Sequence, residues 1–135
     1  MGDWFLCQYS SVAREETLVQ KTIVDVLKLA GLTVLHTSAF AAKGRLGTAK
    51  GVPDLLVHAP DVPLLIIGLE VKTASGRPTP EQKALSEAGM YRIVRSPEDA
   101  LDAAAEALRL YAPESRFLPR VQSLLAQLAR GGARR

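Results

Sequence analysis

Three ionisable residues, Asp54, Glu70 and Lys72, stand at the ends of two apolar, strand-like runs (residues 51–57 and 64–72). Burying such charges in a sheet is costly unless they are paired or bound to a metal. Because side chains alternate along a strand, Glu70 and Lys72 are expected on one face. If the two runs pair as a hairpin, Asp54 joins them there. The three residues would then form a site for a hard divalent cation with a lysine beside it.

Phosphodiester hydrolysis is the chemistry that fits such a site. It needs a positioned water, charge relief at the phosphate and help for the leaving oxygen, and Mg²⁺ or Mn²⁺ held by two carboxylates assists all three. We assign Asp54 and Glu70 as the metal ligands, with the backbone carbonyl of Val71 completing the shell. Lys72 would hold the attacking water, lower its pKa or stabilise developing charge. Whether one ion or two bind stays open.

Glu16 and Gln82 are two further candidates for the catalytic set. Glu16 shares a helical stripe with Val19 and Ile23, whereas the adjacent Glu15 lies off that stripe, so helix phase favours Glu16 as the first acid. Glu16 would bind a second ion or orient a hydrated one. Gln82 opens a later helix, where it would position the water or Lys72.

Each of these residues also has a purely structural interpretation. A Pro-Asp pair often forms a turn, and a Glu-x-Lys pair on a strand usually faces solvent. Glu16 suits the first turn of a helix, and Gln82 completes a capping box with Thr79. Taken together, however, acids at the ends of apolar runs, in this order and with this lysine, favour a catalytic site over these separate structural roles.

The elements that must position these residues follow from periodicity and capping signals. Helices are predicted over about 14–30, from the Thr79 cap to about Gly89, from the Ser96 cap to about Tyr111, and over about 119–130; strands are predicted over 32–37, around 51–57, over 64–72 and over 90–94. This order predicts a single α/β domain with a mixed four-stranded central sheet flanked by helices, plus C-terminal helices. The third strand is apolar on both faces, which predicts a central position covered on each side.

Composition is that of a globular protein, with 47% hydrophobic residues and a formal net charge of +3 in 135 residues. Cys7 is the only cysteine, which excludes an internal disulfide and a thiolate metal cluster. The longest apolar run, around residues 62–69, is too short for a membrane span, and the N-terminus lacks the features of a signal peptide. We therefore expect a cytoplasmic protein with no membrane segment.

Basic residues without neighbouring acids are the candidate contacts to nucleic acid. Lys43, Arg45 and Lys50 share a glycine-containing stretch that leads into Asp54, and Arg77 enters from the loop after Lys72. These side chains and the glycine amides would meet phosphates next to the metal. The alternative is a solvated surface loop. Few aromatic residues lie nearby in the sequence, so we expect recognition of DNA shape and backbone rather than base stacking.

The order Glu16, Asp54, Glu70-x-Lys72, Gln82 resembles the PD-(D/E)XK nuclease superfamily and, within it, the VRR-NUC family. The matching segments lie between about residues 14 and 103: Glu16 with Gln20, Lys50-Gly51-Val52-Pro53-Asp54, Leu69-Glu70-Val71-Lys72, Gly76-Arg77, Pro80-Glu81-Gln82, Ala88-Gly89 and Ser96-Pro97-Glu98-Asp99-Ala100-Leu101. The resemblance implies a restriction-endonuclease-like α-β-β-β-α-β core, which we expect over residues 1–112. Beyond Tyr111 it gives no guidance, and there the apolar helical pattern and the arginines that follow predict a helical extension with a basic tail (113–135) in the same domain.

The resemblance also implies an activity: a Mg²⁺- or Mn²⁺-dependent endonuclease on branched, junction or flap-like DNA. Small members of this kind are phage or bacterial enzymes, often homodimers, which here implies a nucleoid-associated or phage-encoded protein. Two other functions stay open. One is a nuclease-like module that binds DNA without cutting it. The other is a restriction-type enzyme that reads sequence, for which a chain of 135 residues has little room.

Overall fold

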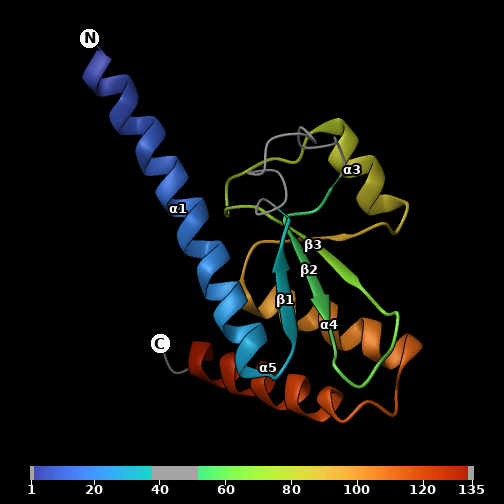
Figure 1. The fold of residues 1–135 in the computed structure, drawn as a ribbon. Helices are drawn as coiled ribbons and strands as arrows, with labels where there is room; N and C mark the ends of the chain where they lie inside the picture. The colour runs from blue at the N-terminus through green and yellow to red at the C-terminus, as the bar shows by residue number, and fades with distance from the viewer. Residues whose placement is uncertain (1, 38–51, 134–135) are drawn as a thin grey trace.

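A mixed sheet of four strands organises the protein, and its strands lie in the order in which they follow along the chain. The computed structural model describes residues 2–37 and 52–133 (Figure 1). The strands are β1 (Thr33–His36), β2 (Leu55–His58), β3 (Ile67–Val71) and β4 (Arg92–Val94). The pairs β1–β2 and β2–β3 are antiparallel, and β3–β4 is parallel. The predicted α/β domain with a mixed four-stranded sheet and flanking helices is confirmed.

One face of this sheet forms the core. The side chains of Ile67, Leu69 and Val71 alternate toward this face and are buried against α1 (Gly2–Leu29) and α4 (Pro97–Tyr111). The helix α4 is rich in buried alanines, which let it lie close to the strands. Apolar burial of this kind is the main stabilising contribution to the fold.

The opposite face is only partly covered. Ile66, just before β3, is 53% exposed and Leu35 of β1 is 48% exposed. β3 is central, as predicted, and its own outward residues are covered, because Glu70 is 6% exposed and Gly68 lies against Tyr91 and Pro53. This cover comes from single side chains rather than from a second helical layer, and Ile66 and Leu35 stay exposed. A short helix, α3 (Pro80–Glu87), lies near one end of the sheet, opposite the end at which α5 (Phe117–Ala133) lies (Figure 1).

Local capping signals fix the starts of α3 and α4 as predicted. The side chain of Thr79 accepts a hydrogen bond from the backbone N–H of Gln82, and the side chain of Gln82 accepts one from the N–H of Thr79, which completes a capping box. Ser96 caps α4 through the N–H of Asp99. After α3, Gly89 has φ +83°, a conformation that favours glycine and ends the helix.

The two terminal helices are longer than predicted. α1 begins at Gly2 rather than near Arg14, and its 28 residues make a rod about 42 Å long whose N-terminal half extends from the body (Figure 1). α5 packs along α4, and its leucines at 124, 125 and 128 lie against the core. None of the helices within residues 2–37 and 52–133 combines the length and apolar character needed to cross a bilayer.

Candidate active site at the Asp54–Glu70 carboxylate pair

The hairpin register brings two carboxylates together. Leu55 of β2 pairs with Leu69 of β3 in an antiparallel ladder. One step further along each strand, Asp54 therefore stands opposite Glu70. Side chains directly opposite each other in such a ladder have Cβ atoms about 5 Å apart. The predicted meeting of Asp54 with Glu70 thus follows from strand pairing alone.

Asp54 is fixed by the backbone of the neighbouring strand. Its Oδ2 accepts a hydrogen bond of 2.9 Å from the N–H of Val71. In an extended strand the N–H and the C=O of one residue point to the same side. The carbonyl of Val71, a predicted metal ligand, therefore points toward the strand edge on which Asp54 lies.

Glu70 is an unusual carboxylate because it is buried and faces another acid. Its side chain is only 6% exposed. Burial, followed by the negative charge of Asp54, raises the pKa of Glu70 to about 7, while the positive charge of Lys72 acts in the opposite direction on that pKa. The electrostatics therefore place Asp54, Glu70 and Lys72 in one cluster, and they disfavour two negative charges there.

Gln82 connects this cluster to the start of α3 and uses both ends of its amide. Its Oε1 accepts from the N–H of Thr79 at 3.0 Å, and its Nε2 donates to Oε1 of Glu70 at 3.1 Å. A backbone N–H can only donate, which leaves the amide nitrogen for the carboxylate. Capping and site contact were alternatives in the sequence; the structure contains both, with Glu70 as the partner of Gln82.

Tyr91 is a residue of this site that sequence reasoning missed. It is 4% exposed, and its hydroxyl donates to the backbone carbonyl of Gln82 at 3.2 Å. Burial and then the charges of Glu70 and Asp54 raise the pKa of Tyr91, which places its ring near both carboxylates. Only the Gly-x-Tyr turn into β4 marks this position in the sequence.

Glu16 is not joined to the cluster by any contact within the described residues. It is exposed on α1, as is Glu15. One turn further along, Gln20 contacts His36 of β1, with Nε2 and Nδ1 3.1 Å apart. His36 pairs with Leu55, the neighbour of Asp54. The helix therefore carries Glu16 toward the Asp54 end of the sheet, and its role stays a prediction.

Of the predicted DNA contacts, Arg77 lies within the described chain and Lys43, Arg45 and Lys50 lie outside it. Arg77 is exposed after a turn that Arg95 holds in place. The guanidinium of Arg95 donates to the carbonyls of Thr73 and Gly76, each at 2.6 Å. These hydrogen bonds hold the turn that joins Lys72 to Arg77 and so fix where the backbone of Arg77 lies.

The donor set suits a hard divalent cation, with few protein ligands. Asp54 and Glu70 offer carboxylate oxygens, and their mutual repulsion is what a bound cation would relieve. Among the described residues, His, Cys, Asp and Glu side chains do not gather in any group of three or more that would hold a metal. A two-carboxylate site matches Mg²⁺, which keeps several waters.

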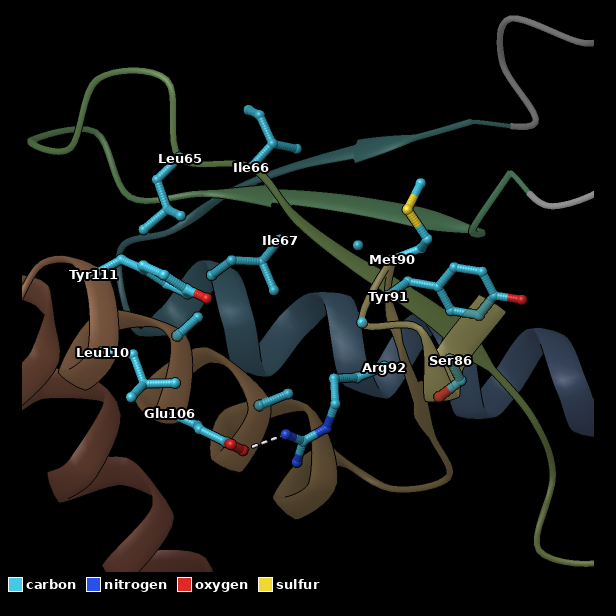
Figure 2. Close-up of a pocket in the computed structure, with 14 residues that line it drawn as sticks. Leu65, Ile66, Ile67, Ser86, Met90, Tyr91, Arg92, Glu106, Leu110 and Tyr111 are labelled. Carbon is cyan, nitrogen blue, oxygen red and sulfur yellow. Dashed lines mark hydrogen bonds and ion pairs between the residues drawn. The ribbon is translucent and has the colours of Figure 1, made fainter. Parts of the chain in front are cut away.

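A hollow in the described part of the protein lies between β3 and α4, away from these carboxylates (Figure 2). It has a volume of about 230 Å³. Its lining is mostly apolar and includes Ile66, Met90, Leu110, Tyr111 and the ion pair between Arg92 and Glu106. Because Asp54, Glu70 and Lys72 do not line it, we assign it no part in the chemistry.

No protein-family model matches this chain, and comparisons with curated proteins and with solved structures find no match either. The function therefore has to be argued from the site itself.

Proposed function

We propose that this protein is a metal-dependent endonuclease that hydrolyses phosphodiester bonds in branched, junction or flap-like DNA. The observation that supports this proposal most is the opposed pair Asp54 and Glu70 with Lys72 beside it. Facing carboxylates repel each other when both are ionised, and a bound cation would relieve that repulsion, while a neighbouring ammonium would stabilise an anionic substrate.

Each residue has a role that its position supports. Asp54 and Glu70 would hold Mg²⁺ or Mn²⁺, with the carbonyl of Val71 as a third oxygen. A bound ion would supply Lewis-acid polarisation of the phosphate and a more acidic water. Lys72 projects from the same face as Glu70, where its ammonium would stabilise negative charge on the phosphate or orient the water. Gln82 would keep the carboxylate of Glu70 in place.

The finer assignment, a restriction-endonuclease-like core of the VRR-NUC kind, belongs to the same proposal. Its support is the order α1, β1, β2, β3, α3, β4 together with acids at the facing ends of β2 and β3. Phosphates would approach along Arg77 and the sequence segment with Lys43, Arg45 and Lys50. We include a homodimer in the proposal because small enzymes that this chain resembles cut paired strands as dimers.

Cleavage of a substrate panel tests this function. Labelled duplex, flap and four-way junction DNA are incubated with wild type, Asp54→Ala and Lys72→Ala in Mg²⁺ or Mn²⁺. Asp25→Asn and Lys28→Ala are matched controls, because both side chains are exposed on the C-terminal part of α1, which does not carry the carboxylate pair. Wild type and both controls are expected to cut, and the two site variants to lose at least about 100-fold in rate. Equal cutting by all five proteins, or cutting that survives chelator, would contradict the proposal.

The second candidate is a module that binds DNA without cutting it. The observation that favours this alternative is that His, Cys, Asp and Glu side chains in the described part of the chain form no group of three or more around a metal position. Fluorescence anisotropy with the same DNA panel separates the two functions. A pure binder holds DNA equally well with and without divalent ions and releases no product, whereas an enzyme shows metal-dependent product formation.

A further inference from the structure

Tyr91 occupies a buried position between α3 and the sheet that the proposed chemistry leaves without a role. It precedes β4, and its side chain is almost fully buried although it carries a polar hydroxyl. In Figure 2 its ring turns away from the pair formed by Arg92 and Glu106, toward the side on which Ser86 of α3 lies. A buried hydroxyl needs a partner, and this one donates to the carbonyl of Gln82.

Two consecutive hydrogen bonds connect Tyr91 with the carboxylate pair. The hydroxyl of Tyr91 holds the main chain of Gln82, and the side chain of the same Gln82 donates to Glu70. Because a side chain starts from its own main chain, fixing the carbonyl of Gln82 limits where its amide can reach. Removing the hydroxyl would let the first turn of α3 shift relative to Glu70.

Gly68 makes this arrangement sterically possible. It lies two residues before Glu70 on the same face of β3. A Cβ at this position would lie 3.0 Å from Cβ of Tyr91 and 3.1 Å from Cγ of Pro53. Both distances are tighter than ordinary van der Waals contacts, so a side chain at this position would require Tyr91 or Pro53 to move by a few tenths of an ångström. Pro53 in turn precedes Asp54, and the packing over Gly68 therefore reaches both carboxylates.

We infer that Tyr91 is a positioning residue of the active site, which acts through Gln82 to set the place of the Glu70 carboxylate. The inference rests on the proposed nuclease function for its effect on rate, but its structural part can be measured without any substrate. Tyr91 does not touch the reacting atoms. Its hydroxyl stays protonated, because burial and then the charges of Glu70 and Asp54 raise its pKa.

The test compares Tyr91→Phe with Tyr111→Phe. The first removes only the hydroxyl and keeps the ring that packs over Gly68. The second removes a hydroxyl from a tyrosine that is 73% exposed and serves as the matched control. Three quantities are measured: the melting temperature, kcat and KM on the best DNA substrate, and the side-chain amide resonances of Gln82 in ¹⁵N-labelled protein, which are assigned from their loss in Gln82→Ala.

For Tyr91→Phe we expect a melting temperature a few degrees below that of wild type, because one buried hydrogen bond is lost, together with displaced Gln82 resonances and a kcat about tenfold lower with KM unchanged. Tyr111→Phe should match wild type in all three. Unmoved Gln82 resonances in Tyr91→Phe would overturn the inference, whatever the rate does. Displaced resonances with an unchanged kcat would overturn its catalytic part. If wild type cuts no DNA, the proposed nuclease function fails, and the Gln82 resonances alone decide whether Tyr91 positions this side chain.

Discussion

Two carboxylates of this protein, Asp61 and Glu70, lie in opposite kinds of surroundings. Asp61, in the loop between β2 and β3, accepts from the hydroxyl of Ser115 at 2.8 Å and from the N–H of Arg116 at 2.9 Å. Each of its oxygens has a donor. Glu70 is buried, faces Asp54 and receives one side-chain donor, from Gln82. The first carboxylate ties a loop to the start of α5, whereas the second is held in surroundings that oppose its charge.

The pKa directions express the same contrast. Burial raises the pKa of Asp61, but the hydrogen bonds from Arg116 and Ser115 outweigh it and the net pKa is lowered. At Glu70 burial and the charge of Asp54 act together, and the pKa rises to about 7. A carboxylate with a donor for each oxygen stabilises its fold. A carboxylate opposite a second carboxylate needs another explanation, and a bound cation provides one.

The largest expected effect is on cleavage, and it compares the two regions directly. Asp54→Asn should lower the rate by at least about 100-fold, because it removes the charge of a proposed metal ligand, whereas Asp61→Asn should change it by no more than about twofold. Both variants are assayed on junction DNA below their melting temperatures. Similar losses in both would remove the distinction between a functional and a structural carboxylate.

A second change disturbs the carboxylate pair through packing alone. Gly68→Ala places a methyl group against Tyr91 and Pro53, and we expect it to destabilise the protein by about 1–3 kcal/mol. Gly131→Ala in α5 is the control, because nothing lies within 4 Å of the added methyl. Denaturant unfolding measures both. A Gly68→Ala protein as stable as wild type would show that Tyr91 and Pro53 can move apart freely.

A third change should stabilise the protein while it abolishes activity. Glu70 has a folded-state pKa of about 7 against an ordinary 4.5, so the unfolded state releases its proton first as the pH rises. The free energy of unfolding therefore falls as the pH rises from 4.5 to about 7, and it stays lower at higher pH. Glu70→Gln cannot ionise, and without metal it should gain on the order of 2 kcal/mol near pH 8 and almost nothing near pH 4.

Denaturant unfolding in chelator, at both pH values, measures this gain. Glu114→Gln is the matched control because it is an exposed glutamate far from the pair in the sequence. Added Mn²⁺ should then stabilise wild type and leave Glu70→Gln unchanged, since only a protein that binds the ion gains from it. A Glu70→Gln protein that is less stable than wild type near pH 8 would contradict the unfavourable surroundings of Glu70.

The smallest expected effect is at Asp61, where the substitution should lower the stability of the protein instead of raising it. Its folded-state pKa lies below the ordinary 3.8, so its ionised form contributes stability above that value, and the contribution disappears as the pH falls through the folded-state pKa. Asp61→Asn should lower the melting temperature by a few degrees near neutral pH and should approach wild type in strong acid. A difference that persists unchanged in acid would show that the contribution of Asp61 does not depend on its charge.

Short-range signals in the sequence predicted much of this structure. The Thr79 capping box, the Ser96 cap and the strands that carry Asp54 and Glu70 all depend on neighbours within a few residues. The register of a hairpin then follows from alternation, which is why the carboxylate pair was predictable. The start of α1 was not, because the apolar stripe on which the helix prediction rested was followed only from about Arg14 onward.

Contacts between distant segments could not be predicted from the sequence. Tyr91 meets Gln82 across a turn and Gly68 across a strand pair, and no local pattern encodes either contact. The exposure of Ile66, which lies in the apolar run that leads into β3, was not predicted for a related reason. An apolar residue such as Ile66 is compatible with burial, but whether a helix covers it depends on the path of the whole chain.

The helix α3 has one more consequence for this protein. It is only eight residues long and none of its side chains is fully buried, so apolar contacts contribute little to holding it on the domain. Polar contacts join it to the rest of the protein, with Gln82 bonded to Glu70 and to Tyr91. Local unfolding of α3 would therefore break the Gln82–Glu70 contact. Hydrogen exchange at the backbone amides of α3 would measure how often the site comes apart.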